Sequence, residues 1–386
     1  MTFQTQLRIP GPTPLPERVV RSMSRPMIDH RGPEFAAILS EITTGAKRVF
    51  KTSNDLLLLT SSGTGGLESA VANLVSPGDE VVVALCGNFG ERFAALAGAY
   101  GADVVRLEFE WGEPADPDDL AQLLEHHPKT TVVLLTHNET STGLTNPLRQ
   151  LARVARDAGK IVVVDGVSSI SSIAIETDTW GIDVAVSGSQ KGWMAPPGLA
   201  LVTVSERAWA QQAKARSPRF YFDWKEAKIW ADKGMTPFTP AVGVAFALQE
   251  GLRMLEEEGL DNVYERHARL ARATQTGLEA LGFRLFARDG YRSNTVTSAL
   301  PPPGLDVAAF RKVLDTKYGV VIAGGQGKMT GKMVRVGHLG AVAEGDVVQV
   351  LWAIEQALEE LDIAPADGRG VAAVTSSLQG VAAAAG

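Results

Sequence analysis

Two side chains with useful chemistry follow neighbouring expected strands. Lys191 stands after the small-residue turn 187–189 and before 196–198 (PPG), which excludes a helix there. Asp165 ends the apolar run 161–164, as expected where a buried parallel strand stops. Open α/β sheets bind ligands at the carboxyl ends of their strands, so we expect the two side chains to lie close together. Taken singly, they have simpler interpretations as a surface lysine and a capping aspartate.

A glycine-rich turn supplies a candidate phosphate site. Residues 61–66 (SSGTGG) connect an expected strand over 54–60 to an expected amphipathic helix. Free backbone N–H groups and the helix dipole both favour an anion at such a start, and Thr64, Gly65 and Gly66 are the candidate contacts. The spacing matches neither the dinucleotide fingerprint GxGxxG nor the P-loop pattern GxxxxGK[ST]. A plain tight turn is the alternative interpretation.

An aromatic residue and a polar loop complete the set. Phe89, in the loop 87–90 (GNFG), is either a stacking platform for a flat ring or a local packing contact. The loop 136–143 (THNETSTG) follows the expected strand 131–135 and adds hydroxyl and amide groups to the same edge. Pyridoxal phosphate needs a lysine for a Schiff base, a carboxylate on its pyridinium nitrogen and a phosphate site. The combination predicts this cofactor, with Asp165 maintaining the protonated ring as an electron sink.

The pattern of elements predicts an α/β protein in two domains. At 386 residues the chain exceeds the usual size of a single core. Strands alternating with amphipathic helices indicate a large domain with a mostly parallel sheet flanked by helices. A helical stretch and shorter strands then predict a smaller α+β C-terminal domain. The expected parts are an N-terminal extended arm (1–20), the large cofactor-binding domain (21–245), the small domain (246–363) and a disordered Ala-, Gly- and Ser-rich tail (364–386).

Composition and missing motifs disfavour several classes of protein. The net charge of -7, without a basic stripe, argues against nucleic acid as a partner. Cys86 is the one cysteine, which excludes an intramolecular disulfide and suits a reducing compartment. No apolar run approaches a membrane span and residues 1–10 carry no secretory pattern, so we expect a cytoplasmic protein. The absence of HExxH, CxxC and GxSxG spacing disfavours a metal centre and a serine hydrolase.

Five parts of the sequence resemble the class V, fold-type I pyridoxal-phosphate aminotransferases, in particular the alanine-glyoxylate, serine-pyruvate and serine-glyoxylate group. They are PGPTPLP, SSGTGGLESA, GNFGER, THNETSTGL, and the pair VVVDGVSS and SGSQKGWMAPPG. The similarity runs from about Pro10 to Leu361. The related cysteine desulfurases use a mobile catalytic cysteine, and we reject that branch because Cys86 lies at a strand end before Phe89.

The resemblance implies a role for each matching residue. Lys191 matches the lysine that forms the Schiff base, and Asp165 the acid on the pyridine nitrogen. Thr140 matches the hydroxyl on the phenolic side of the cofactor, and Arg335, in MVRVGHLG, the arginine that grips the substrate carboxylate. The other cofactor contacts are the phosphate turn Thr64, Gly65 and Gly66, the stacking Phe89, the phosphate-contacting Gln190, and Thr239, which matches a phosphate contact from the neighbouring subunit. We therefore expect a homodimer with the active site at the interface.

The expected reaction is transamination from a small amino acid, alanine or serine, to a small 2-oxo acid, glyoxylate or pyruvate. Lys191 is the expected general base and acid, and Arg335 orients the substrate. One rival keeps the fold and changes the donor to an aminophosphonate or ureidoglycine, which Arg31 in the loop 29–32 leaves open. A second rival is a non-catalytic subunit that binds partners. For Arg335 the alternative interpretation is an internal salt bridge to an Asp or Glu.

Overall fold

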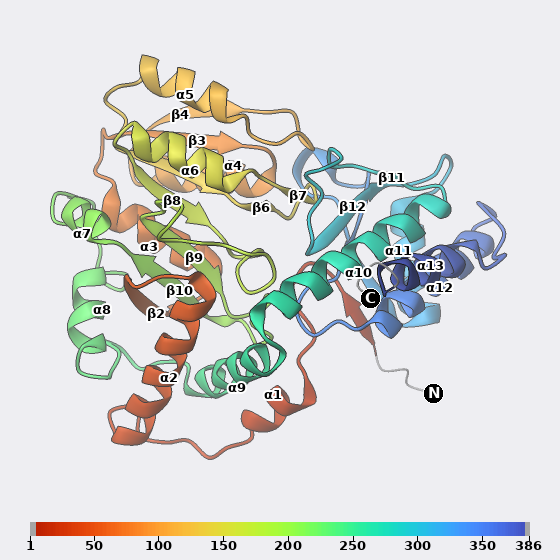
Figure 1. The fold of residues 1–386 in the computed structure, drawn as a ribbon, viewed down its shortest axis with the longest axis horizontal. Coiled ribbons are helices and arrows are strands. Elements are labelled where there is room, and N and C mark those ends of the chain that lie inside the picture. Colours follow the sequence, from red (N-terminus) through yellow and green to blue (C-terminus); the bar gives the residue numbers. More distant parts are fainter. Residues whose placement is uncertain (1–4, 383–386) are drawn as a thin grey trace.

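The computed structural model describes residues 5–382, and its elements are arranged around two main sheets (Figure 1). The larger sheet has the strand order β2-β10-β9-β8-β5-β3-β4. Its strands are β2 (Asp55–Ser61), β3 (Glu80–Leu85), β4 (Asp103–Glu108), β5 (Val132–Thr136), β8 (Ile161–Asp165), β9 (Val184–Gly188) and β10 (Gly198–Val204). Within this sheet β10 runs antiparallel to its neighbours β2 and β9, and the other strands all run in one direction, so their carboxyl ends share one edge. The prediction of a mostly parallel sheet is confirmed.

Helices cover both faces of this sheet because its strands are apolar on both sides. In β8, Val162 and Val164 face one core, and Ile161 and Val163 face the other. The first core includes residues of α1 (Glu17–Ser22), α2 (Pro33–Phe50), α5 (Pro117–His126), α6 (Leu148–Asp157) and α9 (Val242–Glu258). The second includes residues of α3 (Gly63–Leu74), α4 (Asn88–Ala99), α7 (Glu206–Gln212) and α8 (Trp224–Ala231). None of the helices in residues 5–382 is long and apolar enough to cross a membrane.

The smaller sheet joins the N-terminal arm to the C-terminal third of the chain. Its strand order is β1-β13-β14-β12-β11. Its strands are β1 (Gln6–Arg8), β11 (Arg284–Leu285), β12 (Val296–Leu300), β13 (Val320–Gly324) and β14 (Val334–Gly337). It shares a third core with α10 (Leu260–Ala280), α11 (Val307–Tyr318) and α12 (Glu344–Glu360). Arg8 of β1 also forms a 2.6 Å ion pair with Asp346 of α12, so the arm is fixed to this part of the protein.

The prediction of a disordered tail over 364–386 is wrong for most of its length. Residues Arg369–Ala382 form helix α13. Val374 and Leu378, at i, i+4 spacing, are buried in the core of the smaller sheet. Gly277 of α10 permits this packing, since a Cβ there would lie 2.6 Å from Cγ2 of Val374. An apolar stripe this narrow is hidden by the Ala- and Gly-rich composition, and residues 383–386 lie outside the described part.

The packing of α9 bears on the division into domains. Its residues Leu248, Leu252 and Leu255 are buried in the first core of the larger sheet. Leu270 of α10 is instead buried in the core of the smaller sheet. The boundary expected at 245/246 therefore falls inside α9, and we propose to place it near Gly259, between the two helices.

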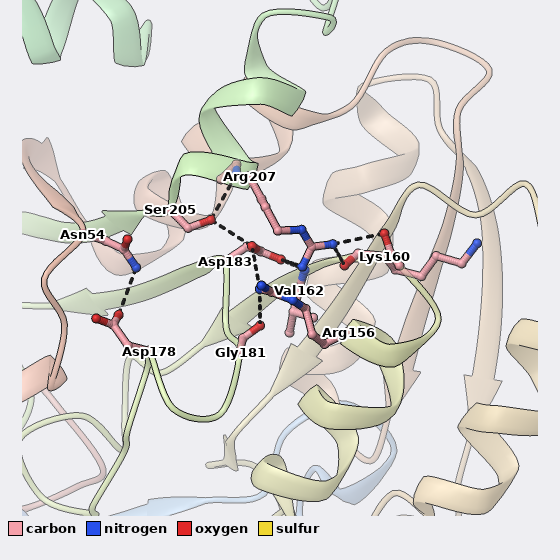
Figure 2. Close-up of polar contacts among 11 residues, drawn as sticks. Asn54, Arg156, Lys160, Val162, Asp178, Gly181, Asp183, Ser205 and Arg207 are labelled. Carbon is pink, nitrogen blue, oxygen red and sulfur yellow. Dashed lines mark hydrogen bonds and ion pairs between the residues drawn. The ribbon is translucent and has the colours of Figure 1, made fainter.

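A buried polar cluster lies at the other edge of the larger sheet, away from the carboxyl ends of the parallel strands (Figure 2). Asp183, fully buried just before β9, accepts hydrogen bonds from the Val162 N–H at 3.0 Å and the Ser205 hydroxyl at 2.8 Å. Arg207 and Arg156 lie 3.2 and 3.4 Å from the same carboxylate. Charged partners and hydrogen bonds together offset the cost of burying a carboxylate. The cluster connects β8, β9 and β10 at this edge and leaves the opposite edge free for ligand chemistry.

Candidate active site

A cavity of about 280 Å³ lies at the carboxyl edge of the larger sheet. It brings together residues that follow β2, β3, β5, β8 and β9, which are far apart in the sequence. The predicted site residues that line it are Thr64, Phe89, Thr140, Asp165, Gln190 and Lys191. The shared edge of the parallel strands therefore produces the constellation that the strand-end pattern predicted.

Lys191 lies under the N-terminal arm. Its Nζ donates a hydrogen bond to the carbonyl oxygen of Pro10 at 2.5 Å. A Cβ on Gly11, whose φ is +126°, would lie 2.6 Å from that Nζ, so the arm approaches this closely only with glycine at this position. Burial lowers the pKa of Lys191 to about 8, while the Asp165 charge acts in the opposite direction. A larger share of Lys191 is therefore neutral at pH 7 than for an ordinary lysine.

Asp165 is the last residue of β8 and its side chain is buried. Its Oδ1 accepts a 2.9 Å hydrogen bond from the Val167 N–H. Within residues 5–382 the side chain makes no other hydrogen bond, so Oδ2 is available to a donor in the cavity. Burial raises the pKa of Asp165 to about 6, and the Val167 hydrogen bond opposes that rise. A positively charged donor beside Oδ2 would restore the ionised form.

The start of α3 offers unpaired donors to the cavity. Ser62 is its N-cap, and the Ser62 hydroxyl accepts from the Gly65 N–H at 3.4 Å. The N–H groups of Gly63 and Thr64 make no hydrogen bond to any described residue. The first turn contains no acidic residue. Free N–H groups at the positive end of a helix form an anion site.

The two remaining glycines of the turn have a packing role. A Cβ on Gly65 would lie 1.8 Å from Oγ of Ser61, and one on Gly66 would lie 2.7 Å from Cγ1 of Val186. Neither glycine lines the cavity, whereas Thr64 does. They bring the first turn of α3 close to the sheet, which positions Thr64 and the free N–H groups.

The amide of Gln190 supports the same anion site. Gln190 lines the cavity, and its amide Nε2–H2 group is the part that can donate to a phosphate oxygen. Its Oε1 is buried without a hydrogen-bond partner among the described residues, so it offers an acceptor to a donor group of a ligand. Arg92, which the sequence reasoning missed, also lines the cavity. Its Nη1 donates to the Thr64 hydroxyl at 3.4 Å, and its guanidinium lies 4.8 Å from the centre of the Phe89 ring. These residues fit a phosphate group, with Phe89 beside it for a planar ring.

Glu139 is a second residue that the sequence reasoning missed. It is fully buried and accepts hydrogen bonds from the N–H groups of Phe89 and Gly90, each at 3.1 Å, and from the Ser141 hydroxyl at 2.5 Å. Burial raises the pKa of Glu139, while these hydrogen bonds oppose the rise. The carboxylate lies at the start of α4 and holds the backbone of Phe89 in place. An acid inside a hydroxyl-rich loop after a buried strand was the available sequence signal.

Arg335 lies in an adjoining cavity of about 360 Å³, which shares Phe89, Thr140 and Lys191 with the first. Its Nε donates to the Gly324 carbonyl at 2.8 Å, and Nη1 donates to the Thr140 carbonyl at 3.2 Å. Within residues 5–382 Arg335 forms no ion pair. The alternative interpretation of Arg335, an internal salt bridge to an Asp or Glu, is therefore wrong for this part of the chain. Burial lowers the pKa of Arg335 to about 10, which leaves it charged at pH 7. A buried cation beside a cavity, with no acidic partner, fits an anionic ligand.

Two other candidates do not reach the cavities of their own chain. Thr239 is exposed on the segment before α9 and lines neither cavity. Arg31 donates to the carbonyls of Thr236 at 2.6 Å and Pro237 at 3.1 Å, and also lines neither. Within a single chain, Arg31 is therefore no substitute for Arg335.

Comparison with known sequences identifies the protein family to which this chain is similar. The profile of the aminotransferase class-V family matches residues 7–345. The small subunit of a soluble hydrogenase from Synechococcus is 40% identical, covering 98% of this chain and 99% of its own length. L-aspartate–glyoxylate aminotransferase from Paracoccus denitrificans is 37% identical (100% and 99% covered). Serine–glyoxylate aminotransferase from Methylorubrum extorquens is 36% identical (97% and 96% covered).

Solved structures agree with the sequence comparison. Ureidoglycine-glyoxylate aminotransferase from Bacillus subtilis superimposes with a TM-score of 0.92 at 30% identity, covering 98% of this chain and 99% of that one. Alanine–glyoxylate aminotransferase from Nostoc gives a TM-score of 0.89 at 33% identity, with 93% and 96% covered. The predicted fold class, a large domain with a mostly parallel sheet and a smaller C-terminal part, is that of these proteins.

Proposed function

The chain belongs to the class V aminotransferases, which are enzymes dependent on pyridoxal phosphate, and we propose that it moves an amino group from alanine or serine to glyoxylate or pyruvate. The named relatives pair glyoxylate with different donors, which supports glyoxylate as the acceptor more strongly than any single donor. The observation that carries the proposal is the placement of Lys191 and Asp165 at one cavity and of Arg335 at the next.

The cavity residues divide into those that would hold the phosphate and those that would hold the ring. We assign the phosphate to the start of α3, with Thr64 and the amide of Gln190 as side-chain contacts. We assign Phe89 to the ring face, Thr140 to the phenolic side and Asp165 to the ring nitrogen. When bound, pyridoxal phosphate supplies an aldehyde that condenses with amines and a ring that withdraws electrons from the substrate α-carbon.

Lys191 has the position and the proton affinity of the catalytic base. Its Nζ is proposed to attach the cofactor in the resting enzyme and, once the substrate amine has taken its place, to remove the proton from the substrate α-carbon. A pKa lowered to about 8 suits this task near neutral pH, because the neutral amine is available without losing its basicity. The Pro10–Gly11 segment above it limits the access of water to Nζ.

Arg335 is the proposed binding residue for the substrate carboxylate. Its Nε and Nη1 are held by carbonyl oxygens, while Nη2 makes no hydrogen bond to any described residue. The guanidinium is therefore fixed before the substrate arrives, and the orientation of the substrate costs less entropy. Since Lys191 lines the same cavity, a carboxylate on Arg335 directs the α-carbon toward Nζ.

A homodimer is the proposed assembly, with Thr239 contributing to the phosphate site of the partner. Phe238, next to Thr239, lies among aromatic side chains of the loop before α8. Its ring centre is 5.6 Å from that of Phe220, which is 80% exposed, and 4.9 Å from that of Tyr221, on which it stacks. Exposed aromatic groups of this kind are typical of protein interfaces.

Half-reactions test the proposed function. The protein is loaded with pyridoxal phosphate, and L-alanine or L-serine should convert the cofactor to its amine form, which glyoxylate should reverse. Borohydride reduction of the loaded protein followed by peptide mapping should place the label on Lys191. Label on another lysine would contradict the site assignment.

The two rivals give different results in the same assay. A non-catalytic subunit, suggested by the similarity to the hydrogenase subunit, would convert no amino acid at all. The buried side chains of Asp165 and Arg335 argue against this rival, because ionisable groups that are buried without a function lower the stability of the fold. A donor change, suggested by the ureidoglycine enzyme, would show conversion by ureidoglycine or an aminophosphonate and none by alanine or serine.

A further inference from the structure

The cavity that holds Arg335 contains more positive charge than one amino acid carboxylate can neutralise. Its lining includes Lys191, Arg311 and Arg335 and no Asp or Glu. In the proposed function Lys191 is engaged by the cofactor and Arg335 by the α-carboxylate. Arg311 then remains without an assigned partner.

Arg311 is held beside the same residue as Arg335. Arg311 belongs to α11, and its Nε donates to the Ile322 carbonyl at 3.0 Å. A Cβ on Gly324 would lie 3.1 Å from Nη1 of Arg311, and the Gly324 carbonyl accepts the 2.8 Å hydrogen bond from Arg335. The two guanidinium groups therefore lie at one residue of β13, each fixed through its Nε.

The outer nitrogens of Arg311 are free to bind a ligand. Within residues 5–382 this side chain forms no ion pair, and neither Nη1 nor Nη2 makes a hydrogen bond. Its neighbour Lys312, also exposed, does not line the cavity. The charge of Arg311 adds to the effect of burial in lowering the pKa of Arg335, so the two groups are within electrostatic reach of each other.

We propose that Arg311 binds a second carboxylate of the substrate, so that the enzyme also uses amino dicarboxylic acids with a short side chain, such as aspartate. The inference rests on the proposed function, because it takes Arg335 as the site of the α-carboxylate. A short dicarboxylate spans two cationic groups that lie at one strand residue, and each guanidinium fork matches one carboxylate. Neutral donors leave Arg311 without an anion.

The test compares Arg311→Gln with Lys312→Gln, which removes the same charge one residue away on α11. The measured quantity is the ratio of kcat/KM for L-aspartate to kcat/KM for L-alanine. Arg311→Gln should lower this ratio by about 10- to 100-fold, the loss expected for charge-assisted hydrogen bonds. Lys312→Gln should change it by less than about twofold, as expected for an exposed charge outside the cavity. An unchanged ratio in Arg311→Gln, or an equal fall in both variants, overturns the proposal.

Binding without turnover provides a second readout. Succinate has two carboxylates and propionate one, and their dissociation constants are measured by calorimetry on the loaded enzyme. The native enzyme should prefer succinate, and Arg311→Gln should reduce that preference at least tenfold. Equal affinities in the native enzyme overturn the role of Arg311. Failure of every amino acid to react, with succinate still preferred through Arg311, would instead contradict the proposed function alone.

Discussion

Nζ of Lys191 donates a 2.5 Å hydrogen bond to the carbonyl oxygen of Pro10. The proposed catalytic lysine is therefore held by the N-terminal arm, and not by an acidic side chain. A group that bonds covalently to Nζ leaves it fewer N–H donors, so loading of the cofactor should change this contact with the arm.

The reactivity of Lys191 in the apoprotein should depend on pH with a midpoint near 8. Burial lowers the pKa of Lys191 to about 8, so the unreactive ammonium form dominates below that pH and the nucleophilic amine above it. An ordinary lysine reaches the same point near about pH 10.4. The midpoints of Lys191 and of the exposed lysines are both measured by acetylation with a small reagent over a range of pH, followed by mass spectrometry of each lysine peptide. A midpoint for Lys191 that coincides with that of the exposed lysines would contradict the assignment.

Asp165→Asn should keep the cofactor but lower kcat by about 100-fold or more. A charged contact in a dry site contributes about 3 kcal/mol, and each 1.4 kcal/mol is about a factor of ten. Absorbance titration checks cofactor binding and half-reaction kinetics check the rate. Asp165→Glu, which keeps the charge, should retain more activity. A fully active Asp165→Asn variant would make this residue a structural cap.

The same Asp165→Asn change should stabilise the apoprotein at pH 7. The pKa of Asp165 rises from 3.8 to about 6 on folding, so the folded state binds more protons between these values and loses stability as pH rises through them. Above pH 6 Asp165 is ionised in the folded state, and the free energy of unfolding is lowered by the full amount, on the order of 3 kcal/mol. Denaturant unfolding of the cofactor-free protein should show the gain at pH 7 and little difference below pH 4. A gain of equal size at both pH values would show that the titration of Asp165 is not its source.

Arg335→Lys should raise KM for amino acid donors by about tenfold or more and leave the cofactor spectrum intact. Lysine keeps the positive charge but cannot form the hydrogen bonds that Nε and Nη1 make to Gly324 and Thr140 while also binding a carboxylate. Simple amines without a carboxylate should be poor donors for both proteins and lose nothing further. An equal loss with amines and amino acids would make the arginine structural.

Glu139→Gln should lower the free energy of unfolding by about 1–3 kcal/mol and weaken cofactor binding. The new amide nitrogen would face the N–H groups of Phe89 and Gly90, which now donate to the carboxylate. Glu91→Gln is the matched control, because Glu91 lies in the first turn of α4, the helix that Glu139 contacts, and forms an exposed ion pair with Arg106. If both variants bind the cofactor equally well, Glu139 does not position Phe89.

Variants at Thr239 and Phe220 should distinguish the assembly of the dimer from the binding of the cofactor. Thr239→Ala should keep the dimer and weaken cofactor affinity, since one hydroxyl contact to the phosphate is lost. Phe220→Asp should shift the protein toward monomers, because it places a charge on a side chain that is now 80% exposed and apolar. Sedimentation velocity and cofactor titration measure the two effects. A native protein that is monomeric and fully active would contradict both expectations.

The strand-end residues were predictable because a buried parallel strand has a strong sequence signal. The run 161–164 is apolar at every position, so the place where it stops, Asp165, is well defined. The same reasoning located Lys191 and the polar loop 136–143 after their own strands, and the family resemblance then singled out Thr140 within that loop. A single principle, that parallel strands share a carboxyl edge, then placed them together.

The missed features depend on contacts between distant parts of the chain. From the sequence, Glu139 looks like an ordinary polar loop residue, because only the fold brings the N–H groups of Phe89 and Gly90 against its carboxylate. Arg311 appears as an exposed helical residue, and only the fold brings it beside Gly324. The apolar residues of helix α13 are mostly small, and its burial depends on the glycine at position 277 of another helix. None of these follows from local periodicity or composition.

The pairing of β1 with β13 has a consequence for the order of events during synthesis. Gln6 pairs with Val320, so the arm has no strand to join until more than 300 further residues have been made. The strands of the larger sheet all precede β11, so they are made before β13. Until β13 is available, the arm is held near Lys191 only by contacts such as those of Thr13, whose N–H and hydroxyl donate to the Gln190 and Lys191 carbonyls. The pairing with β13 therefore fixes the arm over Lys191 only after all strands of the larger sheet have been made.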